Sequence, residues 1–498
     1  MLGLRDGDRA IAAAPSPIPG QAIRVQIGAA PDSRPVPPGF VGLSIEYGSA
    51  PAYFGPSTDP DGVFDQLVRN LAPGQSPVLR FGGDTTDWTW APTPGVRKPL
   101  GIRYTLGPQW MASTRAAAQA LNARLILGIN FESDSPAIAA AESAALLSGV
   151  GQPSVAGLEL GNEPEVYGTL GWYETAAGVP VLGRPKRYDF ASYLHDYAKV
   201  SRALPATVPF AGPASGARRW LAGLGRFLAS EPRVRLATFH LYPLNRCFTP
   251  RTSPRFPTIA NLLAPASATG LATRVAGAVA TAHARGIPFR VDELNSVSCG
   301  GALGVSDTFA SSLWVLDTLF NMARVGVDGV NIHTFRNAFY EPFAVSEQAG
   351  RWSAEVRPLY YGLLMFARAT PPGARLLPAT YRGPSTLRVW STRSPDGQVR
   401  VVLINGSRAR SVTVAVHPPA APTAAHGLTT ATGILLRAPH ADATTGVTIG
   451  GQSFGASTAT GELSGPARSF TVSAVQGSFA VRVPPATATL LTLGGPSS

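Results

Sequence analysis

Short apolar segments recur along much of the chain, with enough residues between them for a helix. Eight have the length and the β-branched or aromatic content of buried strands: 40–46, 77–83, 124–130, 155–163, 209–213, 235–240, 288–293 and 329–333. Residues 110–122 and 308–324 show helical periodicity between them. This α/β alternation predicts a (β/α)8 (TIM) barrel over residues 37–366, with its active site at the carboxyl ends of the strands. A doubly wound sheet is the alternative, but residues 47–51 do not form the glycine-rich phosphate loop that it normally carries.

The pattern changes from about residue 367. The later segments are short, mostly alternate apolar with polar positions, and are separated by turn residues: 387–392, 399–404, 411–416 and 479–483. They predict an antiparallel β-sandwich over residues 367–498. Residues 22–27 have the same alternation, so we expect residues 22–36 to add a strand to that sandwich. Residues 1–21 are expected to be disordered or related to export.

Composition narrows the class of protein. The 498 residues are 45% hydrophobic and only 14% charged, with 53 Gly and 46 Pro, as expected of a loop-rich enzyme with two domains. No apolar stretch approaches the roughly 20 residues that cross a bilayer, so we expect no membrane partner. The net charge of +12 comes almost entirely from scattered arginines. We therefore expect no nucleic-acid partner, although the charge is compatible with an acidic substrate.

Two features bear on the compartment. Residues 10–19 have the small-residue and proline character found after an export signal, which predicts a secreted or periplasmic protein, with a cytoplasmic location left open. Cys247 follows the sixth predicted strand and Cys299 the seventh, so their loops should be neighbours. A disulfide between them would indicate an oxidising compartment, and two free thiols are the equal alternative.

Two glutamates end predicted strands that are far apart in sequence. Glu163 lies in an Asn-Glu-Pro context after residues 155–162, and Glu293 ends segment 288–293. The carboxyl ends of barrel strands meet at one face, so we expect both acids to face one cavity. A retaining glycosidase uses two carboxyl groups about 5–5.5 Å apart, one as acid/base and one as nucleophile. A single glutamate could instead cap a helix or bind an arginine, but two such residues favour catalysis.

Further polar residues gather at the predicted strand ends, as either a satisfied structural network or a substrate pocket. They are Glu46, Arg80, Asp84, Asn130, Asn162, His240, Tyr242, Asp292, Asn295 and Arg336. Asn162 can hydrogen-bond a sugar 2-hydroxyl beside the acid, and Tyr242 or Arg80 can keep Glu293 ionised. The histidines and cysteines lack the spacing of metal ligands, so we expect neither a metal nor a cofactor.

At these residues the chain resembles glycoside hydrolase family 79, the β-glucuronidases and heparanase-like enzymes within barrel clan A of retaining glycosidases. The matching segments are 40–46, 79–83, 160–164, 240–242 and 293–301, and segment 446–455 is similar to bacterial and fungal members. The resemblance extends from about residue 22 to the end. It implies a double displacement with Glu163 as acid/base and Glu293 as nucleophile, and it places Tyr242 beside the nucleophile.

The resemblance also bears on the substrate. Members that bind glucuronate hold its carboxylate with tyrosines and with the backbone N–H groups of a glycine pair, which Tyr340, Gly300 and Gly301 match. Ser298 stands where well-described members carry a tyrosine, so this clamp is either rebuilt or absent.

We therefore expect a retaining exo-β-glucuronidase that acts on a carbohydrate substrate. A β-glucosidase or other neutral β-glycosidase and a heparanase-like endo-β-glucuronidase are the alternatives on the same scaffold. A non-catalytic carbohydrate-binding protein is the alternative from another class, and it would be expected to lack one of the two glutamates.

Overall fold

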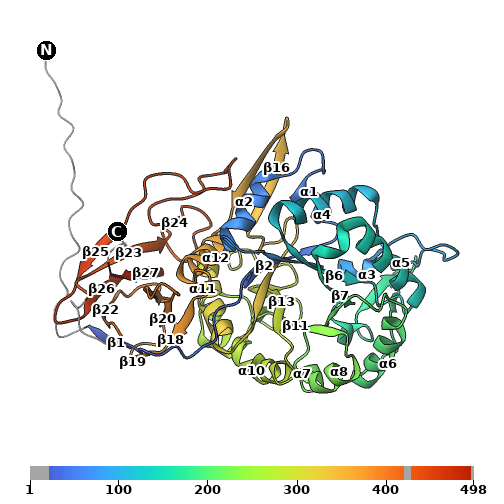
Figure 1. The fold of residues 1–498 in the computed structure, drawn as a ribbon, viewed down its shortest axis with the longest axis horizontal. Helices are drawn as coiled ribbons and strands as arrows, with labels where there is room; N and C mark the ends of the chain where they lie inside the picture. The colour runs from blue at the N-terminus through green and yellow to red at the C-terminus, as the bar shows by residue number, and fades with distance from the viewer. Residues whose placement is uncertain (1–21, 420–427, 495–498) are drawn as a thin grey trace, which may run out of the picture.

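A computed structural model describes residues 22–419 and 428–494. The predicted export-related or disordered segment 1–21 lies outside these residues. The chain forms two lobes, a barrel surrounded by helices and a lobe built of sheets (Figure 1). No helix in the described ranges is both long and apolar enough to span a bilayer.

The first lobe is a closed barrel of eight strands in the order β10-β11-β13-β15-β2-β3-β6-β7, with parallel neighbours throughout. Its strands are β2 (Val41–Glu46), β3 (Val78–Gly82), β6 (Arg124–Ile129), β7 (Val155–Leu160), β10 (Phe210–Ser215), β11 (Val234–Leu241), β13 (Phe289–Leu294) and β15 (Gly329–Thr334). All eight predicted strands are present, and the predicted barrel is confirmed. Strand β7 ends at Leu160 rather than residue 163, because the chain turns at Gly161, where φ is 78°.

Helices cover the outside of the barrel. The longer ones are α2 (Gly62–Leu71), α4 (Pro108–Leu121), α5 (Pro136–Leu146), α6 (Phe190–Ser201), α8 (Leu224–Ser230), α10 (Thr269–His283), α11 (Phe309–Arg324) and α12 (Pro358–Ala369). Shorter ones are α1 (Ala50–Phe54), α3 (Thr85–Trp88), α7 (Arg218–Leu221) and α9 (Ile259–Leu262). The Asp61 side chain starts α2 by accepting two backbone N–H groups, and Asn122 ends α4 in the left-handed conformation.

Four short strand pairs decorate the barrel loops: β4 (Thr89–Trp90) with β5 (Tyr104–Thr105), β8 (Gly171–Glu174) with β9 (Pro180–Leu182), β12 (Leu244–Asn245) with β14 (Val297–Ser298), and β16 (Phe343–Gln348) with β17 (Arg351–Val356). The β16–β17 hairpin projects from the body of the molecule (Figure 1). The β12–β14 pair joins the loops that follow β11 and β13, so it ties the two cysteine-bearing loops together.

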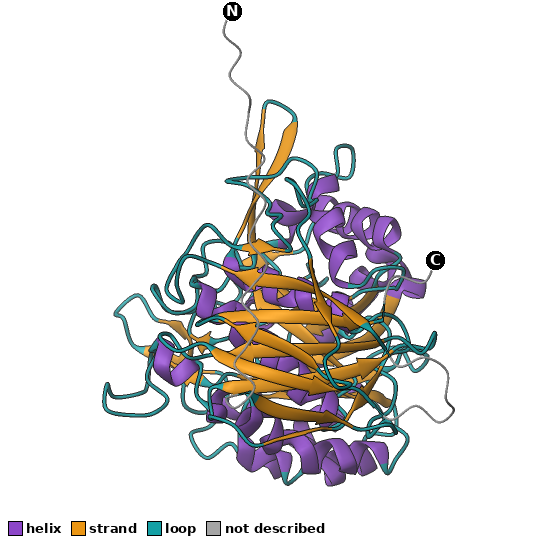
Figure 2. Ribbon diagram, turned by 90° about the vertical axis from the view of Figure 1, so that its left-hand side faces the viewer, coloured by secondary structure: helices purple, strands orange, loops and turns teal. Residues whose placement is uncertain are grey.

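The second lobe contains two sheets. One has the order β19-β1-β22-β26, made of β19 (Ala379–Tyr381), β1 (Ile23–Ile27), β22 (Val412–His417) and β26 (Phe479–Val483). The other contains β18 (Arg375–Leu377), β20 (Leu387–Arg393), β21 (Val399–Asn405), β27 (Thr487–Leu493), β23 (Thr430–Arg437), β24 (Thr448–Ile449) and β25 (Phe470–Ser473). The alternating apolar residues meet in a shared core, and Figure 2 shows these strands stacked in front of the helices.

The predicted uptake of the N-terminal strand is confirmed. Strand β1 lies between β19 and β22, with Ile23 opposite Val414 and Val25 opposite Tyr381. Its pairing with β22 is parallel, whereas the other strand pairs described in this lobe are antiparallel. Val25 and Ile27 are buried in the core of the sandwich, which explains the apolar alternation of this segment.

Helices α11 and α12 separate the barrel from the sandwich and are buried on nearly all sides. The Trp390 ring stacks on Phe320, with centroids 5.4 Å apart, and its N–H donates to the Asp317 carboxylate at 2.9 Å. Arg388 also pairs with Asp317, at 3.3 Å. Helix α12 extends to Ala369, so it crosses the predicted boundary at residue 367.

Candidate active site

The two glutamates reach the barrel mouth by different local structures. Glu293 lies within β13, and its side chain is only 7% exposed. Glu163 lies beyond β7 in the left-handed conformation, with φ 47°, and its N–H donates to the Ala214 carbonyl at 2.8 Å. Its side chain is 30% exposed. A non-glycine residue in this conformation is uncommon, and its backbone bond to β10 holds it there.

The carboxyl groups converge across one small space. One oxygen of Glu163, one oxygen of Glu293 and one nitrogen of His240 all lie within 4.8 Å of one another. The His240 Nδ1 atom is 3.1 Å from the Glu163 carboxylate and 3.9 Å from that of Glu293. The imidazole on β11 therefore lies between two acids that are distant in the sequence.

A fully buried arginine organises the floor of this space. The Arg80 guanidinium on β3 contacts three carboxylates: Glu159 at 2.7 Å, Asp292 at 3.1 Å and Glu293 at 2.8 Å. It also donates to the Asn162 side-chain oxygen at 3.0 Å. A buried charge needs such partners, so Arg80 fixes the nucleophile candidate and its asparagine neighbour in one network.

The surroundings of Glu293 favour its charged form. Burial opposes ionisation, but the His333, His240 and Arg80 side chains outweigh it. The Tyr242 hydroxyl adds a hydrogen bond to the other carboxylate oxygen at 2.8 Å. Together they hold the pKa of Glu293 well below its usual range. The contribution of His333, from β15, could not be inferred from its isolated place in the sequence.

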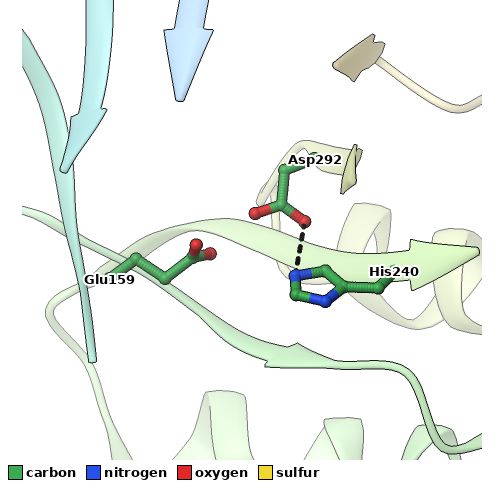
Figure 3. A group of neighbouring side chains, drawn as sticks. All are labelled: Glu159, His240 and Asp292. Atoms are coloured by element: carbon green, nitrogen blue, oxygen red, sulfur yellow. Dashed lines mark ion pairs between the residues drawn. The ribbon is translucent and has the colours of Figure 1, made fainter. Parts of the chain in front are cut away.

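Beneath the acids lies a second group of ionisable side chains, Glu159, His240 and Asp292 (Figure 3). The His240 Nε2 atom is 3.7 Å from Asp292, and all three side chains are buried. Burial and then the Glu159 charge raise the pKa of Asp292 well above its usual value. The donor set resembles a metal site, but Arg80 already contacts both Glu159 and Asp292, so we interpret the group as part of the Arg80 ion network.

Asp84 is an exposed carboxyl group beside the two acids. The Asn162 amide approaches it at 3.5 Å. Partial desolvation by the surrounding protein, followed by the charges of Glu46, Glu163 and Glu293, raises the pKa of Asp84 to about 7. An exposed side chain in this position is available to hydrogen-bond hydroxyl groups of a bound ligand.

Glu46 and Asn130 have internal partners. The Glu46 carboxylate accepts the Thr85 N–H at 2.9 Å and lies 3.4 Å from His333 Nε2. The buried Asn130 amide donates to two backbone carbonyl groups in and after α3, at 2.7 and 2.8 Å. Of these two residues predicted to bind substrate, Glu46 borders the site, whereas the Asn130 side chain orders a loop.

On the rim beside His333, Tyr340 is buried, and its ring centroid lies 5.9 Å from that of His333 and 6.4 Å from that of Tyr242. Gly300 and Gly301 both have positive φ, and a Cβ on Gly301 would come within 2.9 Å of the Tyr340 nitrogen. The Gly301 N–H donates to the Val297 carbonyl at 3.2 Å, which closes the turn. This N–H is therefore already used within the protein.

Ser298 and the two cysteines form the outer part of the same rim. The Ser298 hydroxyl lies 3.5 Å from the Leu244 carbonyl, across the β12–β14 pair. Cys247 and Cys299 form a disulfide, with Cα atoms 6.4 Å apart. The exposed Arg246 donates to the Cys299 carbonyl at 2.9 Å, so a cation lies next to Ser298 in this structure.

Comparisons with known proteins agree with this architecture. No protein-family profile matches the chain. A β-glucuronidase from Neurospora crassa is 23% identical over 411 residues, which cover 73% of this chain and 69% of that protein.

Solved structures show the same fold. A 4-O-α-L-rhamnosyl-β-D-glucuronidase from Fusarium oxysporum 12S matches 94% of this chain and 100% of its own, with a TM-score of 0.69 and 20% identity. The GH51 arabinofuranosidase from Xanthomonas axonopodis pv. citri matches 95% of this chain and 100% of its own, with a TM-score of 0.64 and 14% identity. These proteins are glycoside hydrolases. The present chain has their fold, and the comparisons fit a clan A glycosidase, whereas membership of family 79 stays a prediction.

Proposed function

We propose that the protein is a retaining exo-β-glycosidase that removes terminal β-linked glucuronate. The proposal rests on the short distance between Glu163 and Glu293. One carboxylate oxygen of Glu163 and one of Glu293 lie within 4.8 Å of each other and of one His240 nitrogen. Retaining glycosidases have carboxyl groups about 5–5.5 Å apart, whereas inverting enzymes leave about 6.5–9.5 Å for a water molecule. The short separation favours the retaining mechanism.

In the proposed reaction, Glu293 attacks the anomeric carbon while Glu163 gives its proton to the departing glycosidic oxygen. The glycosyl-enzyme ester neutralises Glu293 and leaves Glu163 ionised. Glu163 then takes a proton from water, whose oxygen attacks the anomeric carbon and releases Glu293 as a carboxylate. The low pKa of Glu293 supports its role as nucleophile, since the nucleophile must be ionised in order to attack.

The orientation of the Asn162 side chain also supports this mechanism. Its oxygen accepts a hydrogen bond from Arg80, so its amide group is oriented with the nitrogen toward Asp84 and the cavity. We assign this amide the 2-hydroxyl of the sugar, an interaction that strengthens in the oxocarbenium-like transition state.

The choice of glucuronate rests on the two glucuronidases among the similar proteins. A neutral β-glycosidase is the second candidate, and two observations favour it. Ser298 lacks the ring expected of a carboxylate clamp, and the Gly301 N–H is bonded to Val297 within the protein. Activity on paired aryl β-glucuronide and aryl β-glucoside substrates distinguishes the two candidates. A clear preference for the glucoside would refute the proposed specificity for glucuronate. Internal cleavage of a heparan-like chain would instead identify endo action.

The catalytic assignment has its own test. Glu293→Ala should abolish turnover, and azide should restore it as a glycosyl azide of inverted anomeric configuration. Glu163→Ala should retain far more activity on substrates with good leaving groups than on those with poor ones, because only the latter need the proton.

Glu142→Gln is the matched control. Glu142 is buried in α5, its burial raises its pKa well above the usual value, and it accepts the Asn130 N–H. Glutamine mimics its protonated form, so activity should be unchanged. Near-normal turnover by the Glu293 variant would refute the nucleophile assignment.

A further inference from the structure

The net positive charge of the chain is concentrated in one part of the barrel. Between Asp196 and Asp292 the sequence contains twelve arginines and one lysine but a single acid, Glu231. This stretch includes strands β10 and β11, the loops that follow them, and helices α7, α8 and α10. Those loops lie at the carboxyl ends of the strands, on the same face as the proposed catalytic acids. The proposed reaction assigns no role to these arginines.

The segment that follows β10 borders the proposed acid/base. A Cβ built on Gly216 would lie 2.8 Å from Glu163 Oε1, so the glycine leaves this carboxyl group open. Helix α7 begins two residues later with Arg218 and Arg219, which are both exposed. The Arg219 guanidinium donates to the backbone carbonyl of Glu165 at 3.4 Å, in the helical turn directly after Glu163. Two cations therefore flank the acid/base.

Further cations come from the loop after β11 and from α10. The exposed Arg255 accepts the Asn245 N–H on its carbonyl at 3.0 Å, and its guanidinium donates to the Pro243 carbonyl at 3.4 Å. Pro243 directly follows the tyrosine that donates to the nucleophile candidate. Helix α10 carries Arg274 and packs against α7, and Figure 1 shows the two helices next to each other. Burial, followed by the charges of Arg255 and Arg218, lowers the pKa of Arg274, so these side chains lie close enough to repel one another.

We call Arg218, Arg219, Arg255 and Arg274 together the arginine surface. Within residues 22–419 and 428–494, none of the four forms an ion pair with an acid, whereas arginines elsewhere, such as Arg388, lie against carboxylates. An anion bound among these like charges would relieve their repulsion. The planar donors of a guanidinium match the oxygens of a carboxylate or of a tetrahedral oxyanion.

We propose that the arginine surface binds an anionic aglycone, that is, a leaving-group sugar that carries a sulfate or a carboxylate. The inference rests on the proposed function. In that reaction Glu163 gives its proton to the glycosidic oxygen, so the aglycone begins beside Glu163 and extends past the segment that follows Gly216. Nucleic acids also attract exposed cations, but the position of this surface next to the acid/base favours a part of the substrate.

Three disaccharides test the proposal, because they share the glucuronate and differ in the aglycone. Glucuronate is β-linked to N-acetylgalactosamine in the first, to its 6-sulfate in the second and to a uronate in the third. The measured quantity is the aglycone ratio, which is kcat/KM for an anionic aglycone divided by kcat/KM for the neutral one. In the wild type this ratio should exceed one for the sulfate, the uronate or both, which identifies the anion that is bound. The ratio should fall as salt is added, since salt screens exposed charges.

Arg218→Gln combined with Arg255→Gln removes two exposed charges of the surface. The aglycone ratio should fall by about five- to tenfold, the effect expected from the loss of two exposed charge contacts, while kcat/KM for the neutral aglycone should change little. Arg24→Gln combined with Arg437→Gln is the matched control. Both of these arginines are exposed on strands of the sandwich, so the control lowers the net charge equally and should leave the ratio unchanged.

Several results would overturn the inference: equal kcat/KM for the three disaccharides in the wild type, a ratio that survives in the arginine variant, or an equal fall in the control. The wild-type comparison decides without any variant. Weaker retention of the arginine variant on duplex DNA with an unchanged ratio would assign the surface to nucleic acid and would also overturn it.

Failure of the proposed function gives a different result. If the glucuronides were not hydrolysed but the corresponding β-glucosides were, the specificity for glucuronate would be refuted. The aglycone ratio measured on the glucosides would then test the arginine surface by itself. Hydrolysis of neither set would overturn both proposals.

Discussion

Replacing Arg80 with methionine tests the ion network beneath the acids. The buried guanidinium contacts Glu159, Asp292 and Glu293 at 2.7, 3.1 and 2.8 Å. Methionine fills part of the space but removes the cation that these carboxyl groups share, so that only nearby histidines such as His240 can offset their charge. Removal of one partner from a buried ion pair costs about 3–5 kcal/mol, and we expect the free energy of unfolding at neutral pH to fall by that amount.

The loss should depend on pH in a defined direction. Burial raises the pKa of Glu159, but Arg80 and its other partners outweigh this and lower it, and Arg80 also helps to lower that of Glu293. A carboxyl group whose folded pKa lies below its unfolded value, about 4.3 for glutamate, adds stability above that value. It loses this contribution as the pH falls through the folded pKa. The difference between wild type and variant should therefore be largest at neutral pH and narrow below about pH 4.

Urea unfolding at several pH values, followed by tryptophan fluorescence, measures this difference. Arg290→Met is the matched control, because Arg290 is also buried in the barrel but donates to the Gly39 carbonyl at 3.0 Å and to Asn331. The loss of unfolding free energy in Arg290→Met should be nearly the same at each pH. The reasoning would be refuted if Arg80→Met lowered the free energy of unfolding by less than about 1 kcal/mol, or if its loss were as independent of pH as that of Arg290→Met.

Three further predictions concern single contacts. Tyr242→Phe removes the hydroxyl donor to Glu293, and a hydrogen bond to a charged group contributes about 1.5–3 kcal/mol. The pKa of Glu293 should therefore rise, and the acid limb of the kcat/KM profile should move to higher pH. An unchanged acid limb would contradict this role of Tyr242. Replacing Cys247 and Cys299 with serine opens a loop of 52 residues and should lower the free energy of unfolding by up to about 4 kcal/mol, as measured by thermal or urea unfolding. Equal stability would show that the two loops keep their structure without the disulfide. Trp390→Phe removes one of several donors to the Asp317 carboxylate at the domain interface, because Asn321 and Arg388 still contact it. A hydrogen bond to a charged group contributes about 1.5–3 kcal/mol, so the unfolding midpoint should fall by up to an equivalent of that amount; no change would indicate that the remaining donors or water replace the indole N–H.

The repeating features of the fold could be predicted from the sequence. Eight barrel strands, helices α4 and α11, and the pairing of β1 with the sandwich all follow from apolar periodicity, because buried faces impose it on the sequence. The positions of Glu163 and Glu293 also follow from strand order alone, since parallel strands bring their ends to one face.

The directions of individual side chains could not be predicted in this way. Asn130 and Asn162 occupy equivalent places after neighbouring strands, yet one amide is saturated by backbone groups and the other borders the cavity. Glu163 was predicted at a strand end but lies in a left-handed turn beyond it. Glu159 and Glu165 face inward from positions at which the sequence shows only an acid among apolar neighbours. These outcomes depend on loop dihedral angles and on contacts across strands.

The place of β1 between β19 and β22 has a consequence for biosynthesis. This strand leaves the ribosome early, whereas the parallel partner that it needs, Val412–His417, is made only after the entire barrel. Its apolar face must therefore stay unpaired while hundreds of intervening residues are translated, and contacts this distant in sequence slow folding. Excising either lobe would break a sheet or expose one side of the buried helices. Strand β1 thus joins the two lobes through pairing with segments that are synthesised several hundred residues later.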